Sequence, residues 1–152
     1  MFCIKPTLLV FMAFIACAYP QSPDGYNLWL GYDKVGKPKL LKEYKDLTNS
    51  IYFEDGGEVL KTAKKEMVTG MEKILGTTLN FTEAPNTNNT FLIAKTATLE
   101  TSLKEKMSDY LSEVGSEGFV LKSITHKGKK LFVLAANEDI GILYGVCNNT
   151  KI

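Results

Sequence analysis

One long amphipathic segment limits the folds that are open to this chain. Between Val59 and Leu75, apolar residues recur at spacings of three and four, the period of a helix with one apolar stripe. Asp55 and Glu58 have the spacing of a capping box that would begin this helix, and Gly76 is placed to end it. Because such a stripe must be buried, the sequence predicts a helix packed against another layer.

Alternating apolar segments on both sides of this helix predict the strands of a sheet. Residues 26–32 alternate onto one face of an extended segment. Residues 118–125 and 130–136 are joined by a short turn in which Gly128 can adopt a positive φ, as a hairpin requires. The remaining strand candidates are 50–53, 78–81 and 91–95.

Two further helices are expected. Leucine and methionine recur every four residues between Leu99 and Leu111, which indicates a second amphipathic helix. A last helix should begin with Asn137 as its cap and with Glu138 and Asp139 in its first turn, where acidic side chains oppose the helix dipole favourably. Residues 36–46 are mostly polar and are interpreted as a connection with about one helical turn.

Together these elements predict one α+β domain. Paired strands with short loops favour an antiparallel or mixed sheet, and the amphipathic helices are expected to cover one face of it as a two-layer sandwich. The hydrophobic fraction of 45% over 152 residues is sufficient for a single core. The net charge of +1 gives no support to nucleic-acid or anionic-membrane binding.

The first residues have the pattern of an export signal. Lys5 precedes an unbroken apolar run over residues 8–18, which is shorter than the roughly 20 residues that a membrane-spanning helix needs. Ala16 and Ala18 form an A-x-A cleavage site. We therefore expect a signal peptide at 1–18, a domain at 24–152, no transmembrane segment and a secreted or periplasmic protein. The alternatives are a lipoprotein anchored through Cys17 and a buried N-terminal helix.

A search for catalytic chemistry finds little. No Cys or His cluster has metal-ligand spacing, so no metal or cofactor is expected. The single histidine, His126, falls in a Lys-rich hairpin turn, which we interpret as solvated. The acidic pairs Glu54–Asp55 and Glu138–Asp139 are both explained by helix starts. No catalytic residue is therefore assigned.

A carbohydrate contact is the one binding function that the residues indicate. Trp29, with Tyr26 and Tyr32 nearby, could form a stacking platform for a sugar ring. The alternative is that Trp29 packs under a helix or against a neighbouring domain. Three sequons, at Asn80, Asn88 and Asn148, match the N-glycosylation pattern and matter only in a host that glycosylates.

Two segments resemble the N-terminal domain of microbial α-glucuronidases, the glycoside hydrolases that remove 4-O-methylglucuronic acid from xylan fragments. These are DGYNLWLGYDKV at 24–35 and EGFVLKSITHKGKKLFVLAANEDIGILYGV at 117–146. The G-x-x-Y-G pattern of Gly141–Gly145 also resembles the analogous non-catalytic domain of β-hexosaminidases. One departure is Gly31, where the family usually has arginine.

The resemblance implies an accessory role. In that family the catalytic carboxylates lie in a (β/α)-eight barrel that follows this domain, so none can be carried onto these residues. The expected partner is that barrel, with xylo-oligosaccharides as a further possibility. The alternatives are a stand-alone sugar-binding module and a protein-docking module, the latter with an exposed apolar patch around Ile142, Leu143 and Val146.

Overall fold

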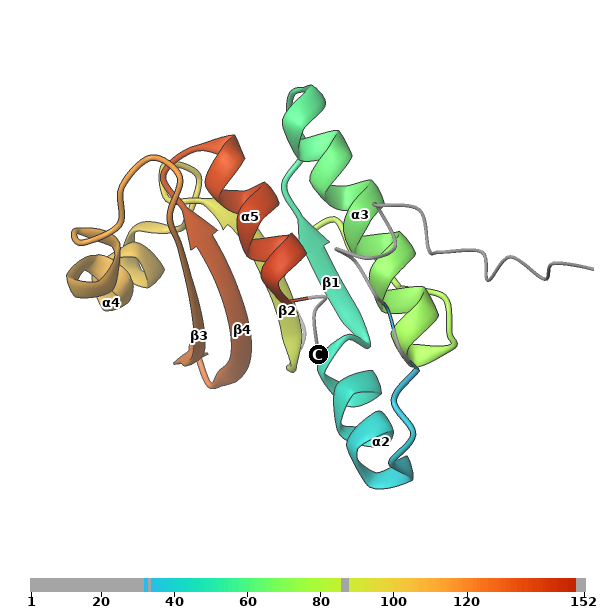
Figure 1. The fold of residues 1–152 in the computed structure, drawn as a ribbon. Helices are drawn as coiled ribbons and strands as arrows, with labels where there is room; N and C mark the ends of the chain where they lie inside the picture. Colours follow the sequence, from blue (N-terminus) through green and yellow to red (C-terminus); the bar gives the residue numbers. More distant parts are fainter. Residues whose placement is uncertain (1–31, 33, 86–87, 150–152) are drawn as a thin grey trace, which may run out of the picture.

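A computed structural model describes residue 32 and residues 34–85 and 88–149. Figure 1 shows the arrangement of the helices and strands in this part of the chain. The elements are α2 (Pro38–Leu47), β1 (Ser50–Phe53), α3 (Glu58–Leu75), β2 (Thr90–Lys95), α4 (Thr101–Leu111), β3 (Phe119–His126), β4 (Lys129–Ala136) and α5 (Asp139–Asn149).

The sheet is mixed, with the strand order β1-β2-β4-β3. β1, β2 and β4 are parallel, while β3 runs antiparallel to β4 as the second arm of a hairpin. The hairpin turn consists of Lys127 and Gly128, both at positive φ (50° and 75°), as the right-handed twist of the flanking strands favours. The predicted α+β class, mixed sheet and hairpin are thus confirmed.

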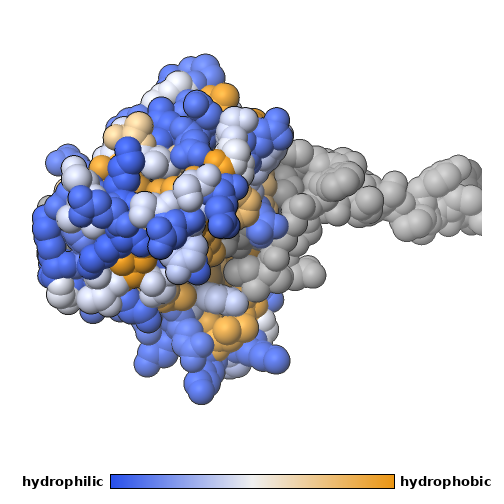
Figure 2. Space-filling view, turned by 90° about the vertical axis from the view of Figure 1, so that its left-hand side faces the viewer, coloured by the Kyte–Doolittle hydropathy of each residue, from blue (hydrophilic) through white to orange (hydrophobic). Residues whose placement is uncertain are grey.

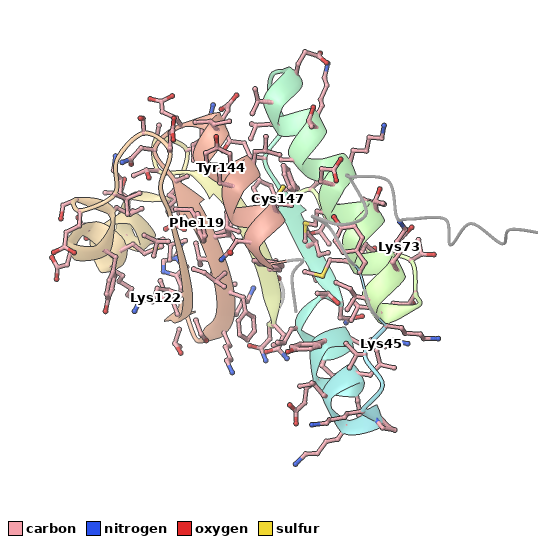
Figure 3. All side chains as sticks on the ribbon, viewed as in Figure 1. Lys45, Lys73, Phe119, Lys122, Tyr144 and Cys147 are labelled. Atoms are coloured by element: carbon pink, nitrogen blue, oxygen red, sulfur yellow. The ribbon has the colours of Figure 1, made fainter. Side chains whose placement is uncertain are left out.

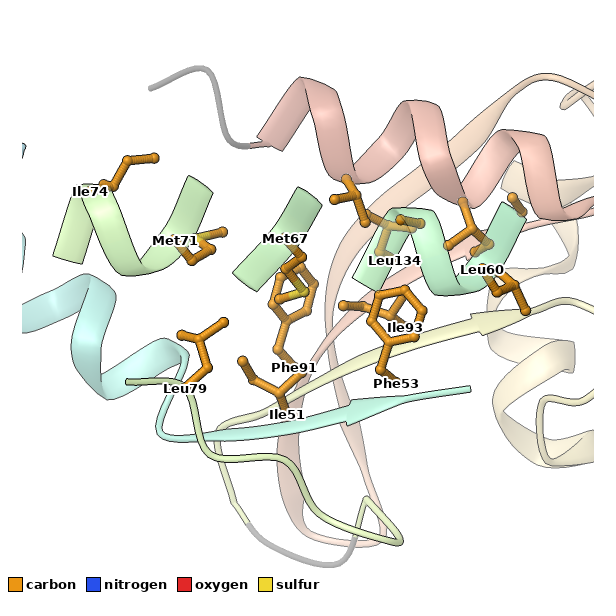
Figure 4. Close-up of a cluster of buried hydrophobic side chains, with 14 of the residues drawn as sticks. Ile51, Phe53, Leu60, Met67, Met71, Ile74, Leu79, Phe91, Ile93 and Leu134 are labelled. Atoms are coloured by element: carbon orange, nitrogen blue, oxygen red, sulfur yellow. The ribbon is translucent and has the colours of Figure 1, made fainter. Parts of the chain in front are cut away.

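Helices α3 and α5 cover one face of the sheet (Figure 1). Ile51 of β1 and Phe91 and Ile93 of β2 point to this face, where Figure 4 shows them packed against Met67 and Leu60 of α3. This cluster contains most of the predicted apolar stripe of α3. The helix ends as predicted at Gly76, which has the left-handed backbone (φ 63°, ψ 33°) that terminates many helices.

Helix α4 packs on the opposite face, which corrects the prediction that the amphipathic helices share one face. Leu103 and Met107 of α4 are buried against Leu92 of β2 and Val133 of β4. The sequences of β2 (TFLIAK) and β4 (KKLFVLAA) do not alternate between apolar and polar residues, so each strand has apolar side chains on both faces of the sheet. A continuous apolar run is typical of a strand that is covered on both sides, so each face requires a helix.

The G-x-x-Y-G pattern has a structural explanation in α5. A methyl group on Gly141 would overlap the carbonyl oxygen of Gly118 and lie 2.8 Å from the Cβ of Ala136. On Gly145 it would lie 3.0 Å from side-chain atoms of Leu134 and Phe119. The two glycines therefore let the helix backbone approach the sheet closely.

Three local predictions were wrong. Most of segment 36–46 belongs to the ten-residue helix α2 (Pro38–Leu47), which starts with Pro38 in the first turn, where proline is well tolerated. Segment 78–81 forms no strand of its own, only an isolated bridge between Phe81 and Ile51. The last helix begins at Asp139, and the Asn137 side chain instead donates to the carbonyl oxygen of Val114 (2.6 Å) and accepts from Thr96 (3.0 Å).

The surface on the α4 side is largely hydrophilic, with hydrophobic residues in small separate patches (Figure 2). In the part of the chain that the structure describes, no helix combines the length and apolar character needed to cross a membrane.

Candidate functional site

Charged side chains meet at the carboxyl ends of the three parallel strands. Glu54 follows β1, Lys95 ends β2, and Asp139 begins α5 just after β4. The Lys95 ammonium lies 2.9 Å from Oδ1 of Asp139 and 3.7 Å from Oε1 of Glu54. The hydrogen bond to Asp139 raises the pKa of Lys95, and the charge of Glu54 adds to this against the desolvation of the ammonium. Lys95 thus bridges two carboxylates from separate strand ends.

Glu54 does not act at the start of α3. Its Oε2 accepts hydrogen bonds from the backbone N–H of Lys95 (2.6 Å) and from the hydroxyl of Thr98 (2.8 Å), and the residue is buried. The N-cap of α3 is Gly57, and no side chain caps the helix, so the predicted capping box is wrong. The burial and the bonds of Glu54 indicate that this cluster holds strand ends together.

A second polar cluster joins the β3–β4 hairpin to α4. Oε2 of Glu100, the residue before α4, lies 3.2 Å from Nε2 of His126. Its Oε1 lies 2.6 Å from the ammonium of Lys127 and accepts a hydrogen bond from the Ser102 hydroxyl at 3.0 Å. His126 is only 8% exposed, which corrects the interpretation of this hairpin as solvated.

The charge on Glu100 fixes the proton on His126. Hydrogen bonds from Lys127, then from His126 and Ser102, lower the pKa of Glu100 to about 2. Because this carboxylate is ionised at neutral pH and only accepts hydrogen bonds, Nε2 of His126 must be the donor. Nδ1 of the same ring is buried and has no hydrogen-bond partner among the described residues.

This cluster borders a cavity of about 320 Å³, which we call the hairpin cavity. Its polar lining includes Glu100, His126, Lys127 and Lys129 from the cluster and the hairpin. Its other lining residues are Tyr52, Pro85, Leu92, Ala94, Thr98, Leu99, Leu103 and Leu131. The lining of the hairpin cavity is therefore about half polar and half apolar.

A second hollow of about 320 Å³, the apolar groove, opens between α2 and the sheet on the α3 side. Its lining is nearly all apolar, and Leu121 of β3 is 45% exposed there. The main lining residues are Tyr44, Leu47, Met71, Leu75, Phe91, Leu121 and Phe132. The predicted patch around Ile142 and Val146 is wrong, since both side chains are buried in the core under α5.

The structure describes only one of the three residues of the predicted sugar platform. Trp29 and Tyr26 lie outside the described residues, while Tyr32 is half-buried and packs against the core cluster under α3. The ammonium of Lys73, labelled on α3 in Figure 3, lies 5.4 Å from the centre of the Tyr32 ring. At least one face of this ring is therefore occupied by protein.

The three asparagines of the predicted glycosylation sequons lie on the surface. The side chains of Asn80, Asn88 and Asn148 are exposed, as glycosylation would need. Tyr144 and Cys147 belong to α5 (Figure 3), and Tyr144 is exposed.

Within the described ranges, no group of three or more His, Cys, Asp or Glu side chains could hold a metal ion. Sequence reasoning missed Glu100, whose only signal is an acidic residue directly before a helix.

A comparison with protein families assigns most of this chain to a family model. The family model described as glycosyl hydrolase family 67 N-terminus matches residues 28–148. The match includes every helix and strand from α2 to β4 and all but the last residue of α5. A comparison with curated proteins finds no match.

Proposed function

Since this chain belongs to glycosyl hydrolase family 67 and carries its N-terminal domain, we propose that it is a non-catalytic accessory domain of an exported α-glucuronidase-like glycoside hydrolase. The reaction that it would assist is the release of 4-O-methylglucuronic acid from xylan fragments. The single observation that carries this proposal is the family match over 28–148. The paired opening and closing motifs, both within or overlapping that range, support it.

The charges at the strand ends support a role without catalysis. A glycosidase of the common type needs two carboxyl groups that face a substrate. Glu54 and Asp139 instead face Lys95, which lies 3.7 and 2.9 Å from them. The other carboxylate oxygen of Glu54 accepts hydrogen bonds from the backbone N–H of Lys95 and from the hydroxyl of Thr98. Both carboxylates thus have structural partners.

The apolar groove supports a role in assembly. Exposed apolar surface of this kind commonly marks a contact with another domain or protein. We propose that the catalytic barrel packs against the groove at Leu121, Phe132 and Tyr44. The accessory domain would then orient and stabilise the barrel.

An activity assay tests this function. We expect the purified chain to show no turnover of aldouronic acids. A family 67 barrel produced without its own N-terminal domain should gain activity or thermal stability when this chain is added. Appreciable turnover by the chain alone, or a barrel that does not respond to it, would contradict the proposal.

Two variants test the groove itself. Leu121→Lys puts a charge on an exposed side chain inside the groove, and Val59→Lys does the same on α3 outside it. We expect only Leu121→Lys to abolish the effect on the barrel, because burying an unpaired ammonium is unfavourable. Equal effects of the two variants would locate the contact elsewhere.

We also propose export through the apolar run at 8–18. The pattern around Ala18 supports cleavage before Tyr19. Mass spectrometry of the chain recovered from a secreting host should show Tyr19 as the first residue. A lipid-modified chain that begins at Cys17 would support the lipoprotein alternative, and an uncleaved Met1 would contradict both.

A further inference from the structure

Strand β3 forms one edge of the sheet, on the side of the molecule where α4 lies (Figure 1). In the part of the chain that the structure describes, β3 pairs with β4 and with no other strand. At the opposite edge, the backbone of Ile51 in β1 bonds to the backbone of Asn80 and Thr82. An edge strand has backbone groups that point away from the sheet and can pair with another chain, so β3 is the edge that can accept a further strand.

The hairpin geometry identifies the residues of β3 that point outward. The two-residue turn makes His126 and Lys129 a hydrogen-bonded pair, and such pairs alternate with non-bonded pairs along an antiparallel ladder. Lys130, which lies opposite Thr125, fits this alternation because its backbone bonds to the segment before β2 instead. The N–H and C=O groups that point outward therefore belong to residues 119, 121, 123 and 125.

The middle of this edge is open. The C=O of Thr125 accepts a hydrogen bond from Nζ of Lys106 on α4, at 2.8 Å. The outward N–H and C=O groups of Leu121 and Ser123 have no partner among the described residues. Both of these side chains are exposed, that of Leu121 to 45%. Another backbone can thus reach the edge at these two residues.

Cations flank the open stretch. Lys106 lies at its end, and Nζ of Lys122 lies 4.0 Å from the centre of the Tyr110 ring on α4. Helix α4 also carries Glu105 and Asp109, but Lys106 and Tyr110 are the side chains that contact β3. The strand itself, FVLKSITH, has no acidic residue. The charge beside the edge is therefore positive.

This charge disfavours a second copy of β3 as the added strand. Antiparallel pairing of two copies about Ser123 would place their Lys122 side chains at diagonal positions, roughly 7–8 Å apart. Neither copy would bring a carboxylate from this strand to the other. Lysine at a sheet edge commonly prevents such self-pairing. A strand with acidic side chains is complementary instead.

We propose that the β3 edge binds an extended acidic segment of a partner protein by antiparallel strand addition. The partner has an acidic residue opposite Lys122 and an apolar residue opposite Leu121. Its backbone bonds to Leu121 and Ser123, and a second acidic residue two positions along draws Lys106 away from the C=O of Thr125. In strand addition the backbone provides affinity and alternate side chains provide specificity. The proposal concerns the backbone of β3 and does not rest on the accessory role.

Amide hydrogen exchange of the full chain, measured residue by residue with NMR, tests the proposal. The probe is an acetylated and amidated peptide of sequence Thr-Glu-Thr-Glu-Val, whose residues would lie opposite positions 125 to 121 in that order. At millimolar peptide we expect slower exchange at Leu121 and Ser123. The amides of residues 120, 122 and 124 should change little, because they already bond to β4. A contact made by side chains alone would not protect alternate amides.

Two control peptides separate the charges from the backbone. The peptide Thr-Lys-Thr-Lys-Val keeps the backbone and reverses the charges, so it should bind at least about tenfold more weakly. The acidic peptide with an N-methyl group on its central threonine lacks the N–H that would bond to Ser123. It should also bind at least about tenfold more weakly, because the methyl group removes a hydrogen bond and blocks close approach.

A matched pair of variants tests the role of Lys122. Lys122→Gln removes an ammonium that lies over a tyrosine ring, and so does Lys73→Gln on α3, where the distance to the centre of the Tyr32 ring is 5.4 Å. Figure 3 shows the two lysines on opposite sides of the molecule. We expect Lys122→Gln to weaken binding of the acidic peptide about two- to fivefold and Lys73→Gln to leave it unchanged.

Several results would overturn the proposal. Unchanged exchange at Leu121 and Ser123 in millimolar peptide would show that the edge accepts no strand. Equal binding of the acidic and basic peptides, or equal losses in the two variants, would contradict the role of charge. Protection of the same amides that rises with protein concentration, without peptide, would identify a second copy as the occupant. None of these experiments includes the catalytic barrel, so this proposal and the accessory role fail independently.

Discussion

Nε2 of His126 lies 3.2 Å from Oε2 of Glu100, which links the end of strand β3 to the residue that precedes α4. The same carboxylate lies 2.6 Å from the ammonium of Lys127, at the first turn position of the hairpin. Lys127 has a positive φ of 50°, which is uncommon for a residue with a side chain. One acidic side chain thus fixes the turn and its neighbouring helix relative to each other.

This carboxylate should affect stability in acid. Its pKa is about 2 in the folded chain against an ordinary value of 4.5, so its contribution is complete above pH 4.5 and is lost as the pH falls toward 2. Between pH 4.5 and pH 2, we expect the free energy of unfolding to fall less in Glu100→Gln than in the unmodified chain. Urea denaturation at a series of pH values measures this free energy, with Glu58→Gln as a control from another ion pair. Equal slopes for the unmodified chain and Glu100→Gln would contradict this explanation.

The bridge made by Lys95 should contribute more than an exposed pair. Lys95→Met would leave the buried Glu54 without its cation, and we expect a loss of about 1–3 kcal/mol in the free energy of unfolding. Lys61→Met removes an exposed pair and should cost less than about 1 kcal/mol. Chemical denaturation at neutral pH measures the free energy of unfolding of both variants. Similar losses would show that the Lys95 bridge contributes no more than an exposed ion pair.

The raised pKa of Lys95 also predicts how its contribution to stability changes at alkaline pH. Its contribution is fully present below the ordinary value of 10.5 and is lost as the pH rises through the higher pKa of the folded chain. The difference in stability between the unmodified chain and Lys95→Met should therefore shrink only above pH 10.5. Thermal unfolding from neutral to alkaline pH measures this, and a difference that shrinks already near neutral pH would contradict it.

The close approach of α5 to the sheet should not tolerate a methyl group at Gly141. Alanine is the better helix former by about 1 kcal/mol. However, its Cβ would overlap the backbone oxygen of Gly118, which cannot move aside as a flexible side chain can. We expect Gly141→Ala to destabilise the fold by about 1–3 kcal/mol, as overpacking does. Gly36→Ala, with no atom within 4 Å of the added methyl, should be close to neutral. A stabilised Gly141→Ala would disprove the close packing.

Local patterns predicted the elements whose ends are fixed by local chemistry. The apolar stripe of α3 and its stop at Gly76 depend on spacing and on one left-handed residue. The hairpin turn depends on Gly128 and its neighbours. Both can be recognised within a few residues, because the interactions that form them are short in sequence.

The errors involve contacts between distant residues. Glu54 has the sequence context of a helix start, but its partners Lys95 and Thr98 are 41 and 44 residues away. His126 lies in a Lys-rich turn and is nevertheless buried beside Glu100. A charge pattern cannot show that a carboxylate 26 residues away will lie against the ring, so the candidate site emerged only from the tertiary structure.

The position of α4 on its own face of the sheet gives the final prediction. Met107 is fully buried between α4 and the strands, whereas Tyr110 on the same helix is 47% exposed with Lys122 4.0 Å from its ring centre. Met107→Ala removes buried volume and should cost about 2–5 kcal/mol, while Tyr110→Ala should cost about 1 kcal/mol at most. Hydrogen exchange should also show a larger loss of protection in α4 than in α3 of Met107→Ala, because the two helices pack on opposite faces of the sheet. If α4 instead shared the face of α3, both helices would lose protection equally, and that result would contradict their placement on opposite faces of the sheet.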